Sequence, residues 1–197
     1  MEMVHHMTLG DLYNHLRKQT RDDLYPPGRR VQAAVASFCI VRDHHHAIAI
    51  LLDEGLYASA FALTRPLYEA AVKGLWLAHC ANDGDAERYA LGKELPEISE
   101  IVEQLIKSDL PVLISNQMKK IKKRDWKTLS SFTHAGHAQV RRWMMPDGVG
   151  PIYTEAEISD ITKFTAFLAV VASLERARLG NNERAISDIT SLLPVDE

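Results

Sequence analysis

The chain has 197 residues, of which 46% are apolar and 25% charged, and its formal net charge at pH 7 is −3. This composition is typical of a globular protein of one domain, and the slightly acidic balance argues against a general nucleic-acid-binding or membrane-surface protein. Two cysteines without a close pairing, together with an N-terminal stretch that has no apolar leader, predict a cytoplasmic protein with reduced thiols. The uninterrupted apolar runs are too short to predict a membrane-spanning helix.

Helical periodicity divides the first part of the chain into three predicted helices. A short one over 9–19 follows Thr8 as its N-cap and belongs to a peripheral N-terminal segment, 1–25. A long amphipathic helix begins near Arg29 and ends at Gly55, and a second long helix runs over 57–80. The short connection between the two long helices predicts that they pack as antiparallel neighbours.

The following part of the chain is also predicted to be helical. One or two turns are expected over 85–91, and an amphipathic helix opens at Pro96 and stops at Pro111. A further helix is predicted over 124–143, and it ends because the proline- and glycine-rich loop 146–151 cannot continue it.

Thr154 and Glu157 form a capping box that starts the last long helix, which ends at Gly180. A short peripheral helix is expected within 181–197. The chain shows no strand-type alternation. It therefore predicts an all-α fold over 1–197, a single-domain antiparallel helical bundle with three or four long helices and short peripheral ones.

The predicted helix over 57–80 has only three charged side chains, Arg65, Glu69 and Lys73. Arg65 and Glu69 lie four residues apart, so they share a face and can pair, and Trp76 continues that face. Between them, Pro66 removes a backbone hydrogen bond to the preceding turn. Buried charges are costly unless paired. The pair is therefore either a structural lock that also satisfies the carbonyls freed by the proline, or a group that holds a ligand or orients a catalytic residue.

On the predicted helix over 124–143, Ser130, His134, His137 and Arg141 follow spacings of four, three and four, which places them on one face. Two imidazoles at this spacing could bind a divalent metal, or one could transfer protons near neutral pH. The alternative is a half-exposed polar face with one buried histidine. His134 is preferred because the apolar residues before it should carry it toward the core.

These two faces define the predicted site. The candidates for a catalytic role are Arg65, Glu69 and His134. The predicted ligand-binding set is Arg65, Glu69, Trp76, Ser130, His134, His137 and Arg141.

A metal site is the first alternative. His45 is predicted to lie on the inward face of the helix that begins at Arg29, and with His134 and His137 it could supply ligands for a divalent transition metal from two helices. No Glu-x-x-His pair occurs on the two predicted helices that carry these histidines, so no cofactor is favoured.

A basic run and an apolar run suggest partners. The basic run consists of Lys119, Lys120, Lys122, Lys123 and Arg124. It could contact the phosphates of a nucleic acid, although a run of charged residues is more often a solvated helix face. A homo-oligomer is the other expectation, through helix packing and an apolar contact patch of Phe132, Trp143, Met144 and Met145.

The segments ALTRPLYEAAVKGLWLAHC and WKTLSSFTHAGHAQV resemble a group of uncharacterised bacterial all-helical families. Those families share an Arg-Pro-x-x-Glu helix and a later Ser/Asn-x-x-x-His-x-Gly helix. The correspondence falls on Arg65, Pro66, Glu69, Trp76, His134, Gly136 and Gln139. Some relatives occur in abortive-infection phage defence, so the resemblance implies a role in phage defence or stress response without naming a reaction.

Two more distant similarities mark alternatives. The helical HEPN ribonucleases share an Arg-x4–6-His motif, and no histidine of this chain satisfies that spacing. The stretch His134-Ala135-Gly136-His137 is similar to the second histidine helix of DinB-like metal-binding bundles.

The favoured hypothesis is a helical bundle with an internal polar site of Arg65, Glu69 and His134, which binds a small ligand or supports assembly. Whether the protein is an enzyme is left open.

Overall fold

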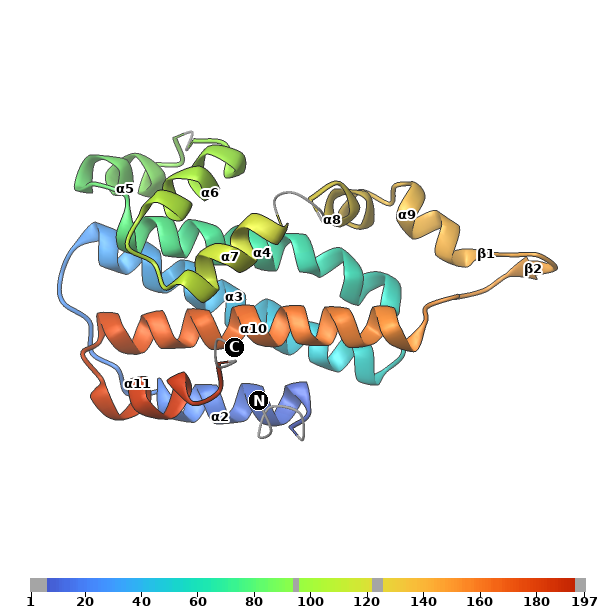
Figure 1. Cartoon of the computed structure of the whole chain (residues 1–197), viewed down its shortest axis with the longest axis horizontal. Coiled ribbons are helices and arrows are strands. Elements are labelled where there is room, and N and C mark those ends of the chain that lie inside the picture. The colour runs from blue at the N-terminus through green and yellow to red at the C-terminus, as the bar shows by residue number, and fades with distance from the viewer. Residues whose placement is uncertain (1–6, 94–95, 122–125, 194–197) are drawn as a thin grey trace.

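The computed structural model describes residues 7–93, 96–121 and 126–193. Three long helices, α3 (Arg29–Asp53), α4 (Tyr57–His79) and α10 (Glu155–Leu179), pack on one another at the centre of the molecule (Figure 1). The strands in the described residues, β1 (Met144–Met145) and β2 (Gly148–Val149), pair as a small antiparallel hairpin. The predicted all-α, single-domain bundle is confirmed.

The hairpin of α3 and α4 depends on small residues at its contact. Gly55 closes the connection with a φ of 69°, a left-handed conformation that favours glycine. Farther along α4, a Cβ atom on Gly74 would lie 2.5 Å from the Cε1 of Phe38, whose side chain is buried. The two helices therefore approach closely because Gly74 leaves room for the aromatic ring.

Shorter helices cover the central three. On one side of α10 lie α2 (Leu9–Gln19) and α11 (Glu183–Thr190), which close a second apolar cluster (Figure 1). Beside α4 lie α5 (Asp83–Ala90), α6 (Ile98–Lys107) and α7 (Val112–Lys120), and the apolar face of α6 is buried as predicted. Helix α7 was not predicted, since Pro111 was interpreted only as a stop, whereas it directly precedes the first turn of the new helix.

The prediction of a single helix over 124–143 is wrong. The chain forms α8 (Trp126–Thr133), turns, and continues as α9 (His137–Val140) and the short 3₁₀ helix η2 (Arg141–Trp143). Ala135 takes a left-handed φ of 48°, and the Gly136 N–H donates to the Ser131 carbonyl at 2.7 Å, a pairing that ends a helix. A side chain on Gly136 would collide with Ser131, so the glycine is required by this close approach.

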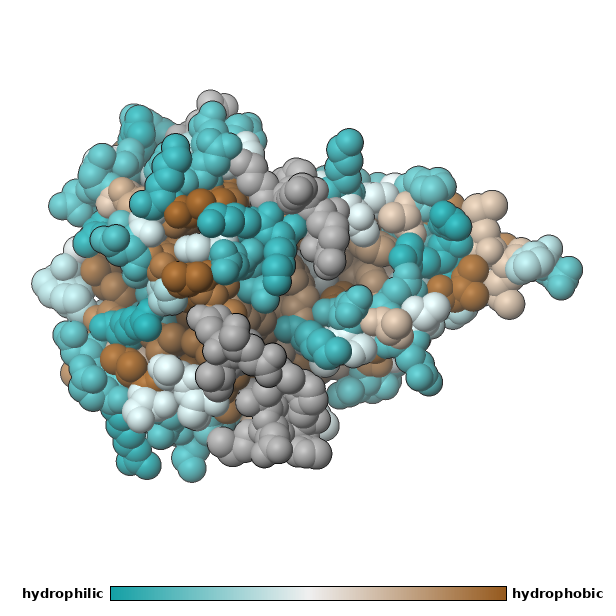
Figure 2. All heavy atoms as spheres, viewed as in Figure 1, coloured by the Kyte–Doolittle hydropathy of each residue, from teal (hydrophilic) through white to brown (hydrophobic). Residues whose placement is uncertain are grey.

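After this break, the hairpin of β1 and β2 projects from the body of the molecule (Figures 1 and 2). Among the described helices, α3 alone is long and apolar enough to cross a membrane, a property that a search for uninterrupted apolar runs missed. Its inner face packs against α4 and α10, an arrangement compatible with a soluble protein.

Candidate functional site

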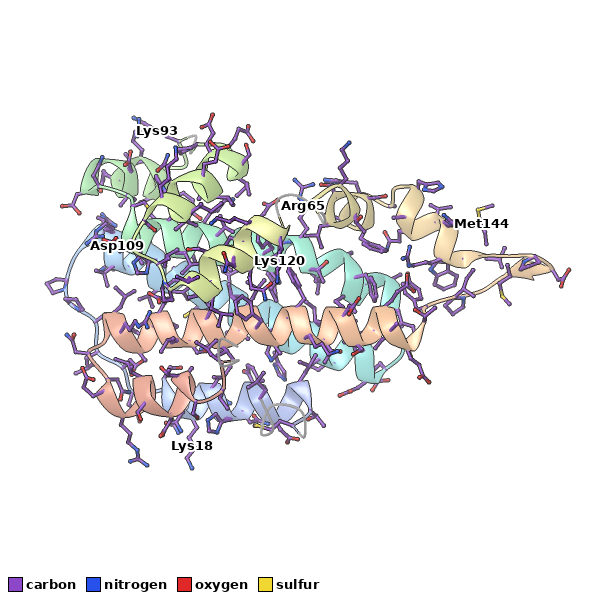
Figure 3. All side chains as sticks on the ribbon, in the orientation of Figure 1. Lys18, Arg65, Lys93, Asp109, Lys120 and Met144 are labelled. Carbon is purple, nitrogen blue, oxygen red and sulfur yellow. The ribbon has the colours of Figure 1, made fainter. Side chains whose placement is uncertain are left out.

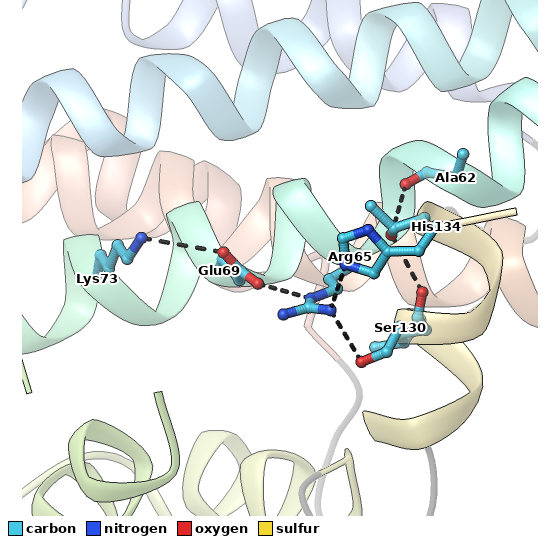
Figure 4. Close-up of polar contacts among 8 residues, drawn as sticks. Ala62, Arg65, Glu69, Lys73, Ser130 and His134 are labelled. Atoms are coloured by element: carbon cyan, nitrogen blue, oxygen red, sulfur yellow. Dashed lines mark hydrogen bonds and ion pairs between the residues drawn. The ribbon is translucent and has the colours of Figure 1, made fainter. Parts of the chain in front are cut away.

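The candidate site lies where α8 crosses α4, and Arg65 is at its centre (Figure 3). The Arg65 Nε donates to the Glu69 Oε1 at 2.7 Å, one helical turn away. The same guanidinium uses Nη1 to reach α8, where it donates to the Ser130 Oγ at 2.9 Å and lies 3.1 Å from the His134 Nε2 (Figure 4). The structure thus brings together four residues from two helices that are about 65 positions apart in sequence.

The location of His134 differs from the prediction. Its ring is exposed, because α8 ends at Thr133 and His134 lies in the turn that follows. An arginine only donates hydrogen bonds, so the His134 Nε2 accepts from Arg65, and the ring in this arrangement is neutral with its proton on Nδ1. A protonated ring would lose this hydrogen bond and place a second positive charge beside Arg65.

The ion pair is half-buried rather than internal. The Arg65 side chain is 22% exposed and that of Glu69 is 26% exposed. Lys73, one turn farther along α4, lies 3.9 Å from the other oxygen of the Glu69 carboxylate (Figure 4). The cationic side chains of Arg65 and Lys73 therefore share the Glu69 carboxylate.

Pro66 positions the site indirectly. Because Pro66 has no N–H, the Ala62 carbonyl lacks its helical partner (Figure 4). The Thr133 hydroxyl lies 3.1 Å from that carbonyl oxygen and also 3.1 Å from the Leu129 carbonyl oxygen of its own helix, so it shares its one hydrogen between the two. The Gln139 side-chain amide donates to the Ala58 carbonyl at 2.9 Å, one turn earlier on α4. The carbonyl freed by the proline is therefore satisfied by α8, and not by the Arg65–Glu69 pair as the sequence suggested.

Three residues of the predicted ligand-binding set do not join the network. The indole of Trp76 is buried and donates to the Gln104 side chain at 2.7 Å, so it fastens α6 to α4. His137 and Arg141 follow the turn after α8 and lie on α9 and η2, where neither is hydrogen-bonded to Arg65 or Glu69. The break in the predicted helix removed these two residues from the face that Ser130 and His134 share.

The structure does not assemble the alternative metal site. His45 is buried between α2 and α10, where its Nε2 lies 3.2 Å from the Leu9 carbonyl oxygen and its Nδ1 lies 3.3 Å from the Thr165 hydroxyl. Burial lowers the pKa of His45 to about 4, so the ring is neutral at physiological pH. Within the described ranges, no three His, Cys, Asp or Glu side chains are grouped closely enough to hold a metal ion.

The predicted basic cluster is described only in part. Lys119 and Lys120 are exposed at the end of α7, whereas Lys122, Lys123 and Arg124 lie outside the described residues.

Sequence reasoning missed a second, more deeply buried set of charges. The Glu175 carboxylate on α10 is only 2% exposed, and it pairs with the His79 Nε2 at 2.7 Å and the Arg178 Nη1 at 2.6 Å. This arrangement joins the end of α4 to α10. The signal available in the sequence was a carboxylate near the C-terminal end of a helix, where the helix dipole disfavours it unless cations compensate.

A groove of about 970 Å³ lies near the network but is separate from it. Its lining includes Phe61 of α4, Phe132 of α8 and Phe164 of α10, and it does not include any of the four residues of the network. The groove is largely apolar, and it is therefore a different kind of surface from the charged network at the α4–α8 crossing.

The fold and the site define an all-α bundle in which a central proline-containing helix holds an Arg–Glu pair against a serine and a histidine of a later helix. Residues 38–194, which contain both of these helices, match the family of unknown function DUF6988. Because this match covers most of the chain, the protein belongs to that family. No curated protein and no solved structure matches the chain.

Proposed function

We propose that the network of Arg65, Glu69, Ser130 and His134 is a recognition site for a small ligand that carries an oxyanion, either a phosphate or a carboxylate group. The observation that carries the proposal is the fixed orientation of Arg65. Glu69 holds the Nε edge of the guanidinium, so Nη1 points toward an exposed imidazole and a serine hydroxyl. A preorganised guanidinium beside neutral donors is the arrangement that binds oxyanions with the least reorganisation.

Binding would exchange one partner of Arg65. In the free protein, the neutral His134 ring accepts from Nη1 at the solvent-facing side of the site. An oxyanion is a stronger acceptor than a neutral imidazole, so it would replace His134 at Nη1. The displaced ring could then turn its Nδ1–H toward the same oxyanion and donate to it. Lys73 adds a second cationic side chain on the same face of α4 as Arg65, which favours an anionic ligand over a cation.

The test is a titration that observes the His134 ring by NMR, with inorganic phosphate and acetate as the probes. We expect a saturable shift of the His134 ring signals at concentrations up to roughly 10 mM, which covers even weak small-ligand affinities. Arg65→Lys should abolish the shift of the His134 signals, because a lysine lacks the planar guanidinium that can donate to Glu69 on one edge and to the anion on another. Arg21→Lys is the matched control, since the Arg21 side chain is 78% exposed and lies away from the site.

A purely structural network would give a different result. In that case the His134 signals would not respond to either anion, although Arg65→Lys would still lower the stability of the protein. That outcome would overturn the proposal and leave the network as a lock between α4 and α8.

A second candidate function is metal-independent cleavage of RNA, and the 3.1 Å separation of the Arg65 guanidinium and the His134 ring favours it. An imidazole can take the proton from a ribose 2′-hydroxyl, whose oxygen then bonds to the phosphorus, and return that proton to the 5′-oxygen as the P–O5′ bond breaks. A guanidinium stabilises the charge that develops on the phosphate. The test compares RNA cleavage by the wild-type protein, Arg65→Ala and His134→Ala. Cleavage that persists in both variants would exclude this site as its source.

A further inference from the structure

The projecting segment of residues 140–152, here called the arm, is unusually apolar for an exposed element. Half of the large apolar side chains that are exposed in the described residues belong to it: Val140, Trp143, Met144, Met145, Val149 and Ile152. Figure 3 shows Met144 beyond the end of α9, on the stretch that leads away from the body of the molecule. Phe132, which was predicted to share this patch, is instead buried against Phe61 and Ile161.

The arm is held at its base and not along its length. The Gly150 N–H donates to the Trp143 carbonyl at 3.0 Å, and the Ile152 N–H donates to the Arg142 carbonyl at 2.7 Å. Arg142 also pairs with Glu157 of α10, which fixes the direction in which the arm leaves the body. Beyond this base, the two strands of two residues each are exposed and, among the described residues, no third strand pairs with them. Such a hairpin is marginally stable alone in water.

Two charged residues flank the apolar centre of the arm symmetrically. Arg141 lies three residues before Met144, and Asp147 lies three residues after it. Both side chains are exposed, and neither forms an ion pair within the part of the chain that the structure describes. Arg141 begins η2 at the base of the arm and Asp147 lies in the turn at its tip, so the arm carries a cation at one end and an anion at the other. Two such arms are complementary in charge when they meet in opposite directions.

We infer that the arm is the contact of a homodimer, in which it meets the arm of a second copy around a two-fold axis close to Met144. Antiparallel arms place Arg141 of each copy opposite Asp147 of the other, and Met144 against Met144. The arrangement is isologous and closed, since both copies use the same surface. Pro146 has no N–H to donate, so side chains rather than a continued sheet form the contact.

The size of the arm sets the expected affinity. A stable interface of standard size uses about 20–30 residues on each side, whereas the arm spans residues 140–152. The dimer should therefore be weak, with a dissociation constant in the range of roughly 1–100 μM, and self-association should be visible only at higher protein concentrations.

The test is a charge exchange between two copies of the full chain, measured by sedimentation or light scattering over a range of concentrations. Arg141→Asp places two aspartates opposite each other at both contacts of a dimer, and Asp147→Arg places two arginines there. We expect each variant alone to be monomeric. An equimolar mixture of the two should dimerise like the wild type, because every contact in the mixed dimer again pairs an aspartate with an arginine.

Circular dichroism verifies that both variants fold, and Arg21→Asp serves as a control that should dimerise normally. A wild-type chain that stays monomeric at all concentrations would overturn the inference, as would a dimer that neither variant weakens. Binding of a monomeric wild-type chain to lipid vesicles would likewise overturn it, since the apolar arm would then serve a membrane.

Discussion

The hydroxyl of Thr133 donates a hydrogen bond to the carbonyl of Ala62, which is the carbonyl that Pro66 leaves without a helical partner. The same residue belongs to the last turn of α8, directly before His134. A proline that would otherwise weaken the central helix therefore marks the place where the later helix docks, and Arg65 stands at this place because it directly precedes the proline.

Replacing Thr133 by valine should lower the free energy of unfolding by about 1–3 kcal/mol, since it leaves the Ala62 carbonyl without a donor. In a Pro66→Ala background the new N–H can satisfy that carbonyl, so the same replacement should cost less than about 0.5 kcal/mol. Urea unfolding of the four proteins in this cycle measures the coupling. Equal costs in both backgrounds would show that the hydroxyl does not compensate for the proline.

Glu175→Gln should destabilise the protein much more than Glu69→Gln. The Glu175 carboxylate is almost fully buried with two basic partners, and the loss of one member of a buried group costs roughly 3–5 kcal/mol. The Glu69 carboxylate is 26% exposed, so solvent screening limits its loss to about 1 kcal/mol. Chemical denaturation of both variants provides the comparison, and similar losses would contradict the assignment of Glu175 as the main buried charge.

The stability of the protein should fall between pH 6.5 and pH 4 because of His45. Burial lowers the pKa of His45 to about 4 in the folded chain, whereas an unfolded histidine titrates near its ordinary value. The unfolded state therefore binds more protons in this interval, and stability decreases as the pH falls, by about 3 kcal/mol from this residue. His45→Gln should flatten the decrease, while the same change at the exposed His137 should not. Identical pH profiles for the wild type and His45→Gln would contradict the prediction.

Gly74→Ala should destabilise the contact between α3 and α4, even though alanine is the better helix former by about 1 kcal/mol. The added methyl would lie 2.5 Å from the Cε1 of the buried Phe38 ring, so the ring or the helix would have to shift within the core. We expect a net loss of about 1–3 kcal/mol from overpacking. Phe38→Leu should reduce the effect of the added methyl, and thermal unfolding of the double variant checks this.

Features encoded by neighbouring residues could be predicted from the sequence. The Thr8 and Thr154 caps, the ends of the first helix and the capping box at Glu157 all depend on contacts within a few positions, and the structure forms them. The Arg65–Glu69 pair is also encoded by neighbouring residues, since a spacing of four places both side chains on one helix face.

The remaining features are a turn that interrupts the helical periodicity and contacts between distant segments. The end of α8 is decided by the close approach of Gly136 to Ser131 and by the left-handed Ala135, and helical periodicity continues past this point. Likewise, no local pattern assigns Thr133 to the Ala62 carbonyl or the Glu175 carboxylate to His79. Such pairings become visible only when the packing of the helices is known.

Helix α2 lies outside residues 38–194, the part that matches the family, yet its Leu12 and Leu16 are buried against α10 and α11. The residues just after it supply the Thr20 carbonyl and the Tyr25 hydroxyl to the guanidinium of Arg176, which is itself buried. A recombinant protein limited to residues 38–194 would therefore begin within α3 and would lack α2, which leaves the apolar side of α10 and α11 exposed to water. The same cut would leave a cation in the interior without acceptors, so the product should precipitate, and recombinant versions need to start ahead of Leu9.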